Sequence, residues 1–108
     1  GDLPLWLAPV QAAVLPVADR HREYAQKVGR ALEDARVAVE VDPRSETLGY
    51  RVRSAETRKI PYVLVVGDRE QSDGTVTVRR RHAPGQETVS VDAFRSRIEE
   101  EIVTRGIS

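Results

Sequence analysis

Apolar residues in the first half of the chain recur with the periods of strands and helices. Residues 10–17 form an apolar run of strand length, bounded by Pro9 and Pro16. Over residues 19–35 apolar positions recur at spacings of three and four, which predicts an amphipathic helix capped by Asp19. Residues 37–41 alternate valine with alanine and glutamate, which predicts a half-exposed strand near a sheet edge. A strand, a helix and a strand with short connections predict a parallel pair, and hence an α/β fold.

A second helix is predicted between Ser45, which can cap it, and Pro61, which ends it. Leu48, Val52 and Ala55 form its inward stripe. Off that stripe lie its basic residues, Arg51, Arg53, Arg58 and Lys59. The pattern therefore predicts a helix with a basic side.

A central strand and a hairpin are predicted next. Residues 62–66 are continuously apolar, as in a strand that is covered on both faces. Residues 72–74, Ser-Asp-Gly, are a tight-turn signal, so residues 75–81 are expected to pair back on residues 62–66 as a hairpin. Within 75–81 apolar and polar residues alternate, and we expect the polar face to lie open and not under a helix.

The C-terminal part predicts one more strand, over residues 87–90, and a helix that begins at Ser90. The inward stripe of that helix is Val91, Phe94, Ile98 and Ile102. At 108 residues the chain is long enough for one core and too short for two. We therefore expect a single domain over residues 1–108, with residues 1–9 as an extended N-terminal segment.

The composition is that of a folded domain without a long-range field of one sign. Apolar residues make up 40% and charged residues 31% of the chain, and 17 basic residues balance 17 acidic ones. No stretch reaches the roughly 18 apolar residues of a membrane span, and the first residues do not resemble a signal peptide. The chain has no cysteine, which fits a reducing compartment. We expect a cytoplasmic protein with no membrane partner.

The sequence offers no evident group for catalysis. No glycine spacing matches a phosphate-binding loop or a dinucleotide fingerprint, and no serine lies in a G-x-S-x-G context. His21 and His82 fall in separate predicted elements with no ligand set nearby, so we expect both at the surface and neither in a metal site. We therefore expect this chain by itself not to be an enzyme and to hold no cofactor.

Basic residues form two clusters despite the neutral total. Residues 44–59 hold five basic residues against Glu46 and Glu56, and residues 79–82 read Arg-Arg-Arg-His. The acidic residues concentrate elsewhere, so one side of the molecule could dock RNA. Charge alone leaves this open, because such clusters are usually solvated faces.

Four segments resemble the C-terminal anticodon-binding domain of threonyl-tRNA synthetases. They are W-L-A-P-V-Q at residues 6–11, L-G-Y-R-V-R at 48–53, K-I-P-Y-V-L-V-V-G-D-R-E at 59–70 and G-T-V-T-V-R-R-R at 74–81. The third alone would indicate the wider group that includes prolyl, histidyl and glycyl enzymes, whereas W-L-A-P-V-Q is typical of threonyl ones. The resemblance implies a three-layer α/β/α fold with three helices and a five-stranded mixed sheet, in the order 2-1-3-4-5 with strand four antiparallel.

By this resemblance, the positions that contact anticodon bases are Ser45, Lys59, Glu70 and Arg79. A carboxylate at Glu70 can accept hydrogen bonds from N1 and N2 of guanine, whereas Arg79 can donate to guanine O6 or to a uracil carbonyl. Threonine anticodons carry guanine and then uracil at their second and third positions. A mixed acidic and basic site fits these bases better than a uniformly basic one.

Each of these positions also has a structural interpretation. Ser45 replaces the asparagine usual in the family, cannot bond a base edge bidentately as an amide can, and can simply cap the helix. Lys59 can complement the helix dipole. Glu70 can pair with Arg69 or Arg79, and Arg79 can be simply an exposed charge on a strand.

Phosphate contacts are expected from the basic residues of the two clusters, Arg51, Arg53, Arg58 and Arg80. In the family, an upstream domain activates threonine with ATP and Mg²⁺ and screens it with zinc, so these cofactors are expected there and not in this chain. The expected partners are tRNA and that catalytic domain, and not DNA. Two alternatives stay open: a stand-alone protein-interaction domain without a role in aminoacylation, and a small hydrolase, for which no nucleophile and base are evident.

Overall fold

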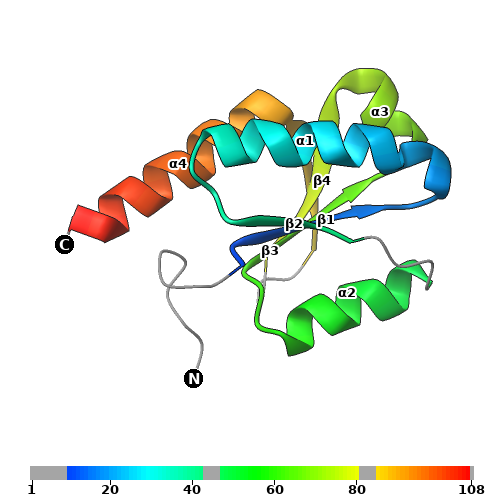
Figure 1. The fold of residues 1–108 in the computed structure, drawn as a ribbon, viewed down its shortest axis with the longest axis horizontal. Coiled ribbons are helices and arrows are strands. Elements are labelled where there is room, and N and C mark those ends of the chain that lie inside the picture. The colour runs from blue at the N-terminus through cyan, green and yellow to red at the C-terminus, as the bar shows by residue number, and fades with distance from the viewer. Residues whose placement is uncertain (1–9, 43–46, 81–84, 108) are drawn as a thin grey trace.

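A five-stranded sheet lies between two layers of helices (Figure 1). The computed structural model describes residues 10–42, 47–80 and 85–107. In chain order the elements are β1 (Ala12–Pro16), the 3₁₀ turn η2 (Asp19–His21), α1 (Arg22–Asp34), β2 (Val39–Val41), α2 (Leu48–Thr57), β3 (Tyr62–Val66), α3 (Asp68–Asp73), β4 (Thr75–Arg80), β5 (Glu87–Ser90) and α4 (Val91–Ile107). In these three ranges no helix has the length and apolar character needed to cross a membrane.

The sheet has the topology expected from the sequence. Its order is β2-β1-β3-β4-β5, with β1 parallel to both of its neighbours. β4 is antiparallel to β3 and to β5. The predicted α/β class, strand order and antiparallel fourth strand are therefore confirmed.

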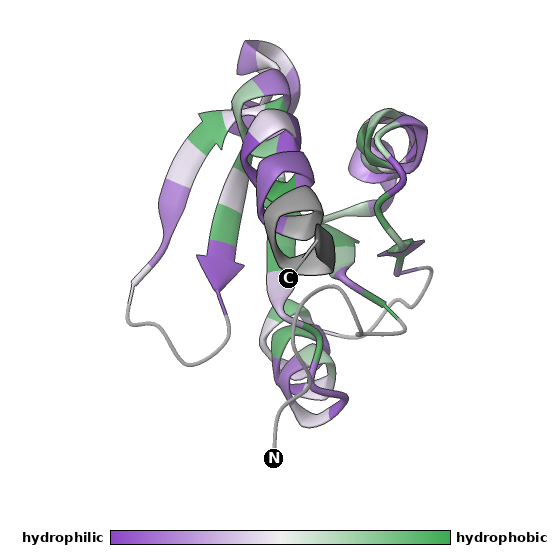
Figure 2. Cartoon of the chain, turned by 90° about the vertical axis from the view of Figure 1, so that its left-hand side faces the viewer, coloured by the Kyte–Doolittle hydropathy of each residue, from purple (hydrophilic) through white to green (hydrophobic). Residues whose placement is uncertain are grey.

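Two apolar clusters hold the layers together, because alternate residues of the central strands point to opposite faces. One cluster joins the sheet to α1 and α4 and includes Val14, Leu64 and Phe94. The other joins it to α2 and includes Leu15 and Val63. In Figure 2 each helix carries both apolar and polar positions, and buried residues of α1, α2 and α4 belong to these two clusters.

The strand register assigns the arginines of β4 to opposite faces of the sheet. Arg79 lies opposite Val63, whose side chain packs in the cluster beneath α2. Arg80 lies opposite Tyr62, which packs in the cluster beneath α1 and α4. Directly opposed residues of an antiparallel pair share a face, so the two neighbouring arginines cannot serve one surface.

The helices α1 and α2, which lead into the parallel strands β2 and β3, are each followed by a basic residue whose backbone has the left-handed conformation. After α2, Lys59 has φ 62° and Ile60 N donates to Ala55 O at 3.1 Å. After α1, Arg36 has φ 65° in the equivalent place. This is the Schellman pattern, in which glycine is the usual residue, and the next residue is buried in each case.

Two predictions about helices are wrong. Residues 68–73 form the short helix α3 where we expected only a tight turn, so the described residues contain four α-helices and not three. Gly74, with φ 71°, ends α3 and leads into β4. Asp19 does not cap α1, because it begins a 3₁₀ turn and α1 starts only at Arg22.

Two of the expected caps have different outcomes. The cap of α2 is Thr47, whose side chain accepts from Tyr50 N at 3.3 Å, whereas Ser45 lies outside the described residues. The cap of α4 is confirmed, since Ser90 Oγ accepts from Ala93 N at 3.1 Å.

Candidate nucleic-acid interface

A groove of about 490 Å³ lies between α2 and the hairpin formed by β4 and β5. Its walls include Val52, Arg53 and Glu56 of α2, Glu70 of α3, and Thr77 and Arg79 of β4. The groove exists because α2 packs against β1 and β3, while the hairpin extends to the side of that helix (Figure 2). It brings together two of the four predicted base contacts, Glu70 and Arg79, and one predicted phosphate contact, Arg53.

Glu70 is held in this groove by two hydrogen bonds. Its Oε1 accepts from Gly67 N at 2.7 Å, which makes it the third residue of α3 reaching back to the residue that precedes the helix. Its Oε2 accepts from Thr77 Oγ1 at 3.2 Å. Since Thr77 donates to the carboxylate, Thr88 Oγ1, 3.1 Å from Thr77 Oγ1, must donate to Thr77. A carboxylate has about four lone-pair sites, so Glu70 keeps acceptor capacity for a ligand.

The two arginines of the groove are held loosely. Arg79 Nη2 lies 4.0 Å from Glu56 Oε1, and both side chains are about half exposed. Within the described ranges, the exposed guanidinium of Arg53 has no ion pair. Both groups are therefore available to an anion or to a base carbonyl.

The polar face of β4 is less open than its alternation predicts. Thr77 is only 8% exposed, because α3 packs against β4 and Glu70 covers the hydroxyl. Arg79, farther along the strand, is exposed. The expectation of an uncovered polar face is wrong for Thr77 and right for Arg79.

Of the other two predicted base contacts, Ser45 lies outside the described residues and Lys59 does not line the groove. Lys59 is exposed at the end of α2, in the left-handed conformation described above. The structure therefore gives Lys59 a role in ending the helix.

Arg51 is buried, with 3% of its surface exposed, and its Nε has no hydrogen-bond partner among the residues that the structure describes. The prediction that it lies off the apolar stripe is wrong. Positions 48, 51 and 55 are spaced three and four apart, so Arg51 shares the inner face of α2 with Leu48 and Ala55. A side chain so enclosed gives no support to the expected phosphate contact.

Arg58 and Arg80 are exposed, but carboxylates already bind them. Arg58 makes a two-pronged pair with Glu40 of β2, at 2.7 and 2.9 Å. Arg80 lies on the other face of the sheet, where it pairs with Glu101 at 3.2 Å and stands 5.7 Å from the centre of the Tyr62 ring. The Tyr62 hydroxyl donates to Glu101 at 2.6 Å, and burial, together with this bond, raises the pKa of Tyr62 to about 12.

One groove residue was not singled out by the sequence, and one histidine lies elsewhere than expected. Gln86 lines it from the segment before β5. His21 was expected at the surface but is buried, with 1% exposed, and it bonds Asp68 at the start of α3. His82 lies outside the described residues. Among the residues that the structure describes, no three histidine, aspartate or glutamate side chains gather as a metal site would require.

Comparison with known proteins agrees with this fold. Residues 11–101 match the model of the family described as "Anticodon binding domain". The chain is 46% identical over 107 residues to a threonine–tRNA ligase of Desulforamulus reducens, covering 99% of this chain and 17% of that protein. The chain thus spans about a sixth of the length of this relative.

Solved structures give the same result. An RNA-binding domain of threonyl-tRNA synthetase from Cryptosporidium parvum superposes with a TM-score of 0.88 at 32% identity, over 94% of this chain and 26% of that one. A prolyl-tRNA synthetase from the same organism shares the fold, with a TM-score of 0.85 at 24% identity over 95% of this chain and 22% of the other. The resemblance that the motifs indicated is confirmed, and the chain belongs to the anticodon-binding domain family.

Proposed function

We propose that this chain binds the anticodon loop of threonine tRNA in the groove between α2 and the β4–β5 hairpin. The observation that carries the proposal is the meeting of Glu70, Arg79 and Arg53 in one solvent-accessible groove. A carboxylate beside guanidinium groups suits an unstacked nucleobase, which presents donors and acceptors on one edge. In the parent enzyme, a threonine–tRNA ligase, aminoacylation with ATP, Mg²⁺ and zinc would belong to a separate catalytic domain.

Each groove residue has a distinct role in this proposal. The remaining lone pairs of Glu70 accept from N1 and N2 of the middle guanine of the anticodon. Arg79 donates to guanine O6 or to the carbonyl of the following uracil. Arg53, on the wall formed by α2, contacts a phosphate.

The remaining basic residues act at the margin of the interface. Arg58 reaches a phosphate only by sharing or leaving Glu40. Arg80 faces the opposite layer, so only RNA that wraps around the hairpin would reach it. Lys59 stands at the end of α2 and contacts RNA outside the groove.

The test is a binding titration with two labelled anticodon stem-loops, one with guanine and one with adenine at the middle anticodon position. Adenine lacks the N1 and N2 donors, so the wild type should prefer guanine, and Glu70→Gln should reduce that preference. Arg79→Ala should cost about 1–3 kcal/mol of discrimination. Affinity should fall with salt, by about 0.7 in log K per phosphate contact for each tenfold increase.

Matched controls are Arg30→Ala on α1 and Glu99→Gln on α4, both exposed residues on the layer opposite α2. Neither should change the preference. Equal losses on both stem-loops would make Arg79 a phosphate contact. An affinity that depends neither on salt concentration nor on the anticodon base, or no binding at all, would contradict the proposal and favour a protein-interaction domain.

A further inference from the structure

The helix that carries Glu70 cannot be held by core packing. α3 has six residues, and none of its side chains is buried. A single isolated turn and a half of helix is unstable in water, so contacts from elsewhere must fix its orientation. The direction in which Glu70 points therefore depends on what holds the start of α3.

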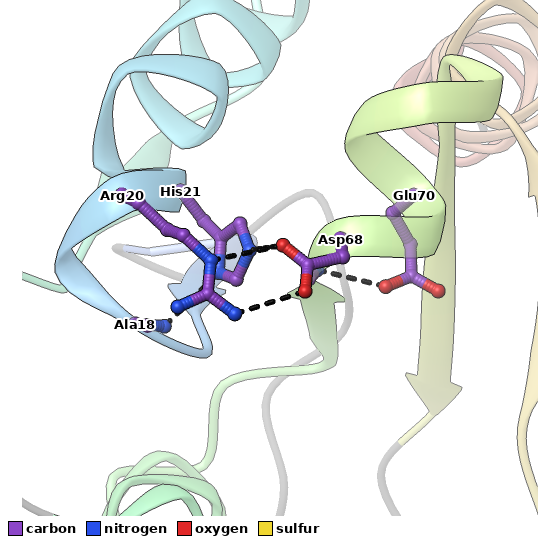
Figure 3. A network of polar contacts seen from close by, with 6 residues as sticks. Ala18, Arg20, His21, Asp68 and Glu70 are labelled. Carbon is purple, nitrogen blue, oxygen red and sulfur yellow. Dashed lines mark hydrogen bonds and ion pairs between the residues drawn. The ribbon is translucent and has the colours of Figure 1, made fainter.

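Asp68, the first residue of α3, is held by two side chains of the turn that follows β1. Arg20 donates from Nε to Oδ1 at 3.0 Å and from Nη2 to Oδ2 at 2.9 Å. His21 Nε2 lies 2.6 Å from Oδ1. Figure 3 shows Arg20 and His21 facing Asp68 on one side of α3, with Glu70 on the other side, toward β4. The bonds from Arg20 and then from His21 lower the pKa of Asp68, so the carboxylate is charged in neutral solution.

His21 is a fixed part of this contact. Its ring is buried, and its Nδ1 accepts from Ala18 N at 3.1 Å. Since Nδ1 accepts, Nε2 of the neutral ring carries the hydrogen and donates to Asp68. The ring thus connects the backbone of the turn after β1 to the first residue of α3.

The turn and the helix also touch through the backbone. Val17 N donates to Val66 O at 2.9 Å, which extends the pairing of β1 with β3 up to Gly67. A Cβ atom at Gly67 would lie 3.2 Å from Val17 Cγ2 and 3.3 Å from Glu70 Oε1. Gly67 therefore lies between Val17 of the turn and the carboxylate of Glu70. We expect a shift of the turn to shift Glu70 as well.

We propose that Arg20, His21 and Asp68 are positioning residues that orient α3 so that Glu70 faces the groove, and that they thereby set the selectivity for the base bound there. This inference rests on the proposed function, because the selectivity in question is that of the groove. The three residues do not line the groove, so they act through Glu70. Arg20 and Asp68 are about 70% exposed, and exposed ion pairs contribute little to global stability.

The experiment measures the ratio of dissociation constants for the guanine and adenine stem-loops in the wild type, Arg20→Ala, Asp68→Asn and Glu70→Gln. Arg20→Ala and Asp68→Asn should each reduce the ratio by about 2-fold to 30-fold, the range seen for residues coupled to a site. In the double variant Arg20→Ala/Glu70→Gln, the loss should equal that of Glu70→Gln alone, because Arg20 acts through Glu70.

Arg22→Ala is the matched control. It removes an exposed ion pair with Asp19, 3.1 Å long, at the start of α1, and should leave the ratio unchanged. An unchanged ratio in Arg20→Ala, or losses that add in the double variant, would overturn this inference while leaving the proposed function intact. If Glu70→Gln itself has no effect, the proposed function fails and this inference fails with it.

Discussion

Glu70 combines a structural and a proposed recognition role, and two substitutions separate them. Alanine removes both bonds of the carboxylate, to Gly67 N and to Thr77. Glutamine keeps one carbonyl oxygen for Gly67 N and can turn its amide group toward Thr77, whose hydroxyl then accepts. We expect Glu70→Ala to destabilise the fold, and Glu70→Gln to leave it nearly unchanged while it alters base selectivity.

The size of the stability loss follows from the contacts. Removing a side chain that satisfies a helix-start N–H costs about 0.5–2 kcal/mol, and Gly67 is buried, so the upper half of that range applies. Thr77 keeps Thr88 as a partner and adds little to the cost. The free energy of unfolding should fall by about 1–2 kcal/mol in Glu70→Ala and by at most about 0.5 kcal/mol in Glu70→Gln. At about 4–8 °C per kcal/mol, the first change is easily measured as a shift in Tm.

Urea unfolding monitored by circular dichroism provides the stability values, and the stem-loop titration gives selectivity. Glu99→Ala, an exposed glutamate of α4, serves as the control for charge removal. Equal destabilisation by alanine and glutamine would show that the negative charge, and not the bond to Gly67, stabilises α3. No destabilisation by alanine would refute the cap itself.

Three further predictions concern positions outside the groove. Arg36→Gly should raise the free energy of unfolding by about 0.5–1 kcal/mol in urea titrations, because glycine adopts φ 65° without the steric cost that a side chain incurs. A lower free energy of unfolding in the variant would contradict this explanation. Spectrophotometric titration should show one tyrosine ionising near pH 12, absent in Tyr62→Phe. Because the folded pKa of Tyr62 is raised above about 10, its contribution to stability should be complete below pH 10 and lost between pH 10 and 12, and an ordinary titration near pH 10 would refute the buried bond. Gly29→Ala should lower the free energy of unfolding by about 1 kcal/mol, because the new methyl would lie 2.9 Å from Val41 Cγ2 and this overpacking outweighs the gain in helix propensity. A more stable variant would show that β2 moves to accommodate the methyl.

The sheet could be predicted from sequence because its strands are defined by local patterns. Residues 62–66 are apolar throughout, and both faces of β3 are indeed covered. The alternation in β4 placed Val76 and Val78 in the core. Period and run length were sufficient for these elements, since they record how many faces a strand buries.

The errors arose where a tertiary contact decides the outcome. α3 has no apolar periodicity because it buries nothing, and its fixing partners Arg20 and His21 lie far away in sequence. Arg51 was assigned to the solvent side by its charge, although its helical position is inward. Glu70 and Arg79 were named by resemblance. They share a groove because the register of β3 with β4 puts Arg79 on the face of α2, and Glu70 bonds to Thr77 on that same face.

The distribution of ion pairs explains how a chain with no net charge could select an RNA base. Arg20, Arg58 and Arg97 are each bound by a carboxylate in two-pronged contacts of 2.7–3.3 Å, so their charge is largely compensated. Among the described residues, the ion pair of Arg79 is the 4.0 Å contact with Glu56, and Arg79 stands in a groove with Arg53. A phosphate gains more from cations whose charge is not already compensated, which favours docking at the rim of this groove. In the proposed function, the carboxylate of Glu70 would repel phosphate and accept from a base, so it would weaken nonspecific binding and favour a guanine that presents two donors.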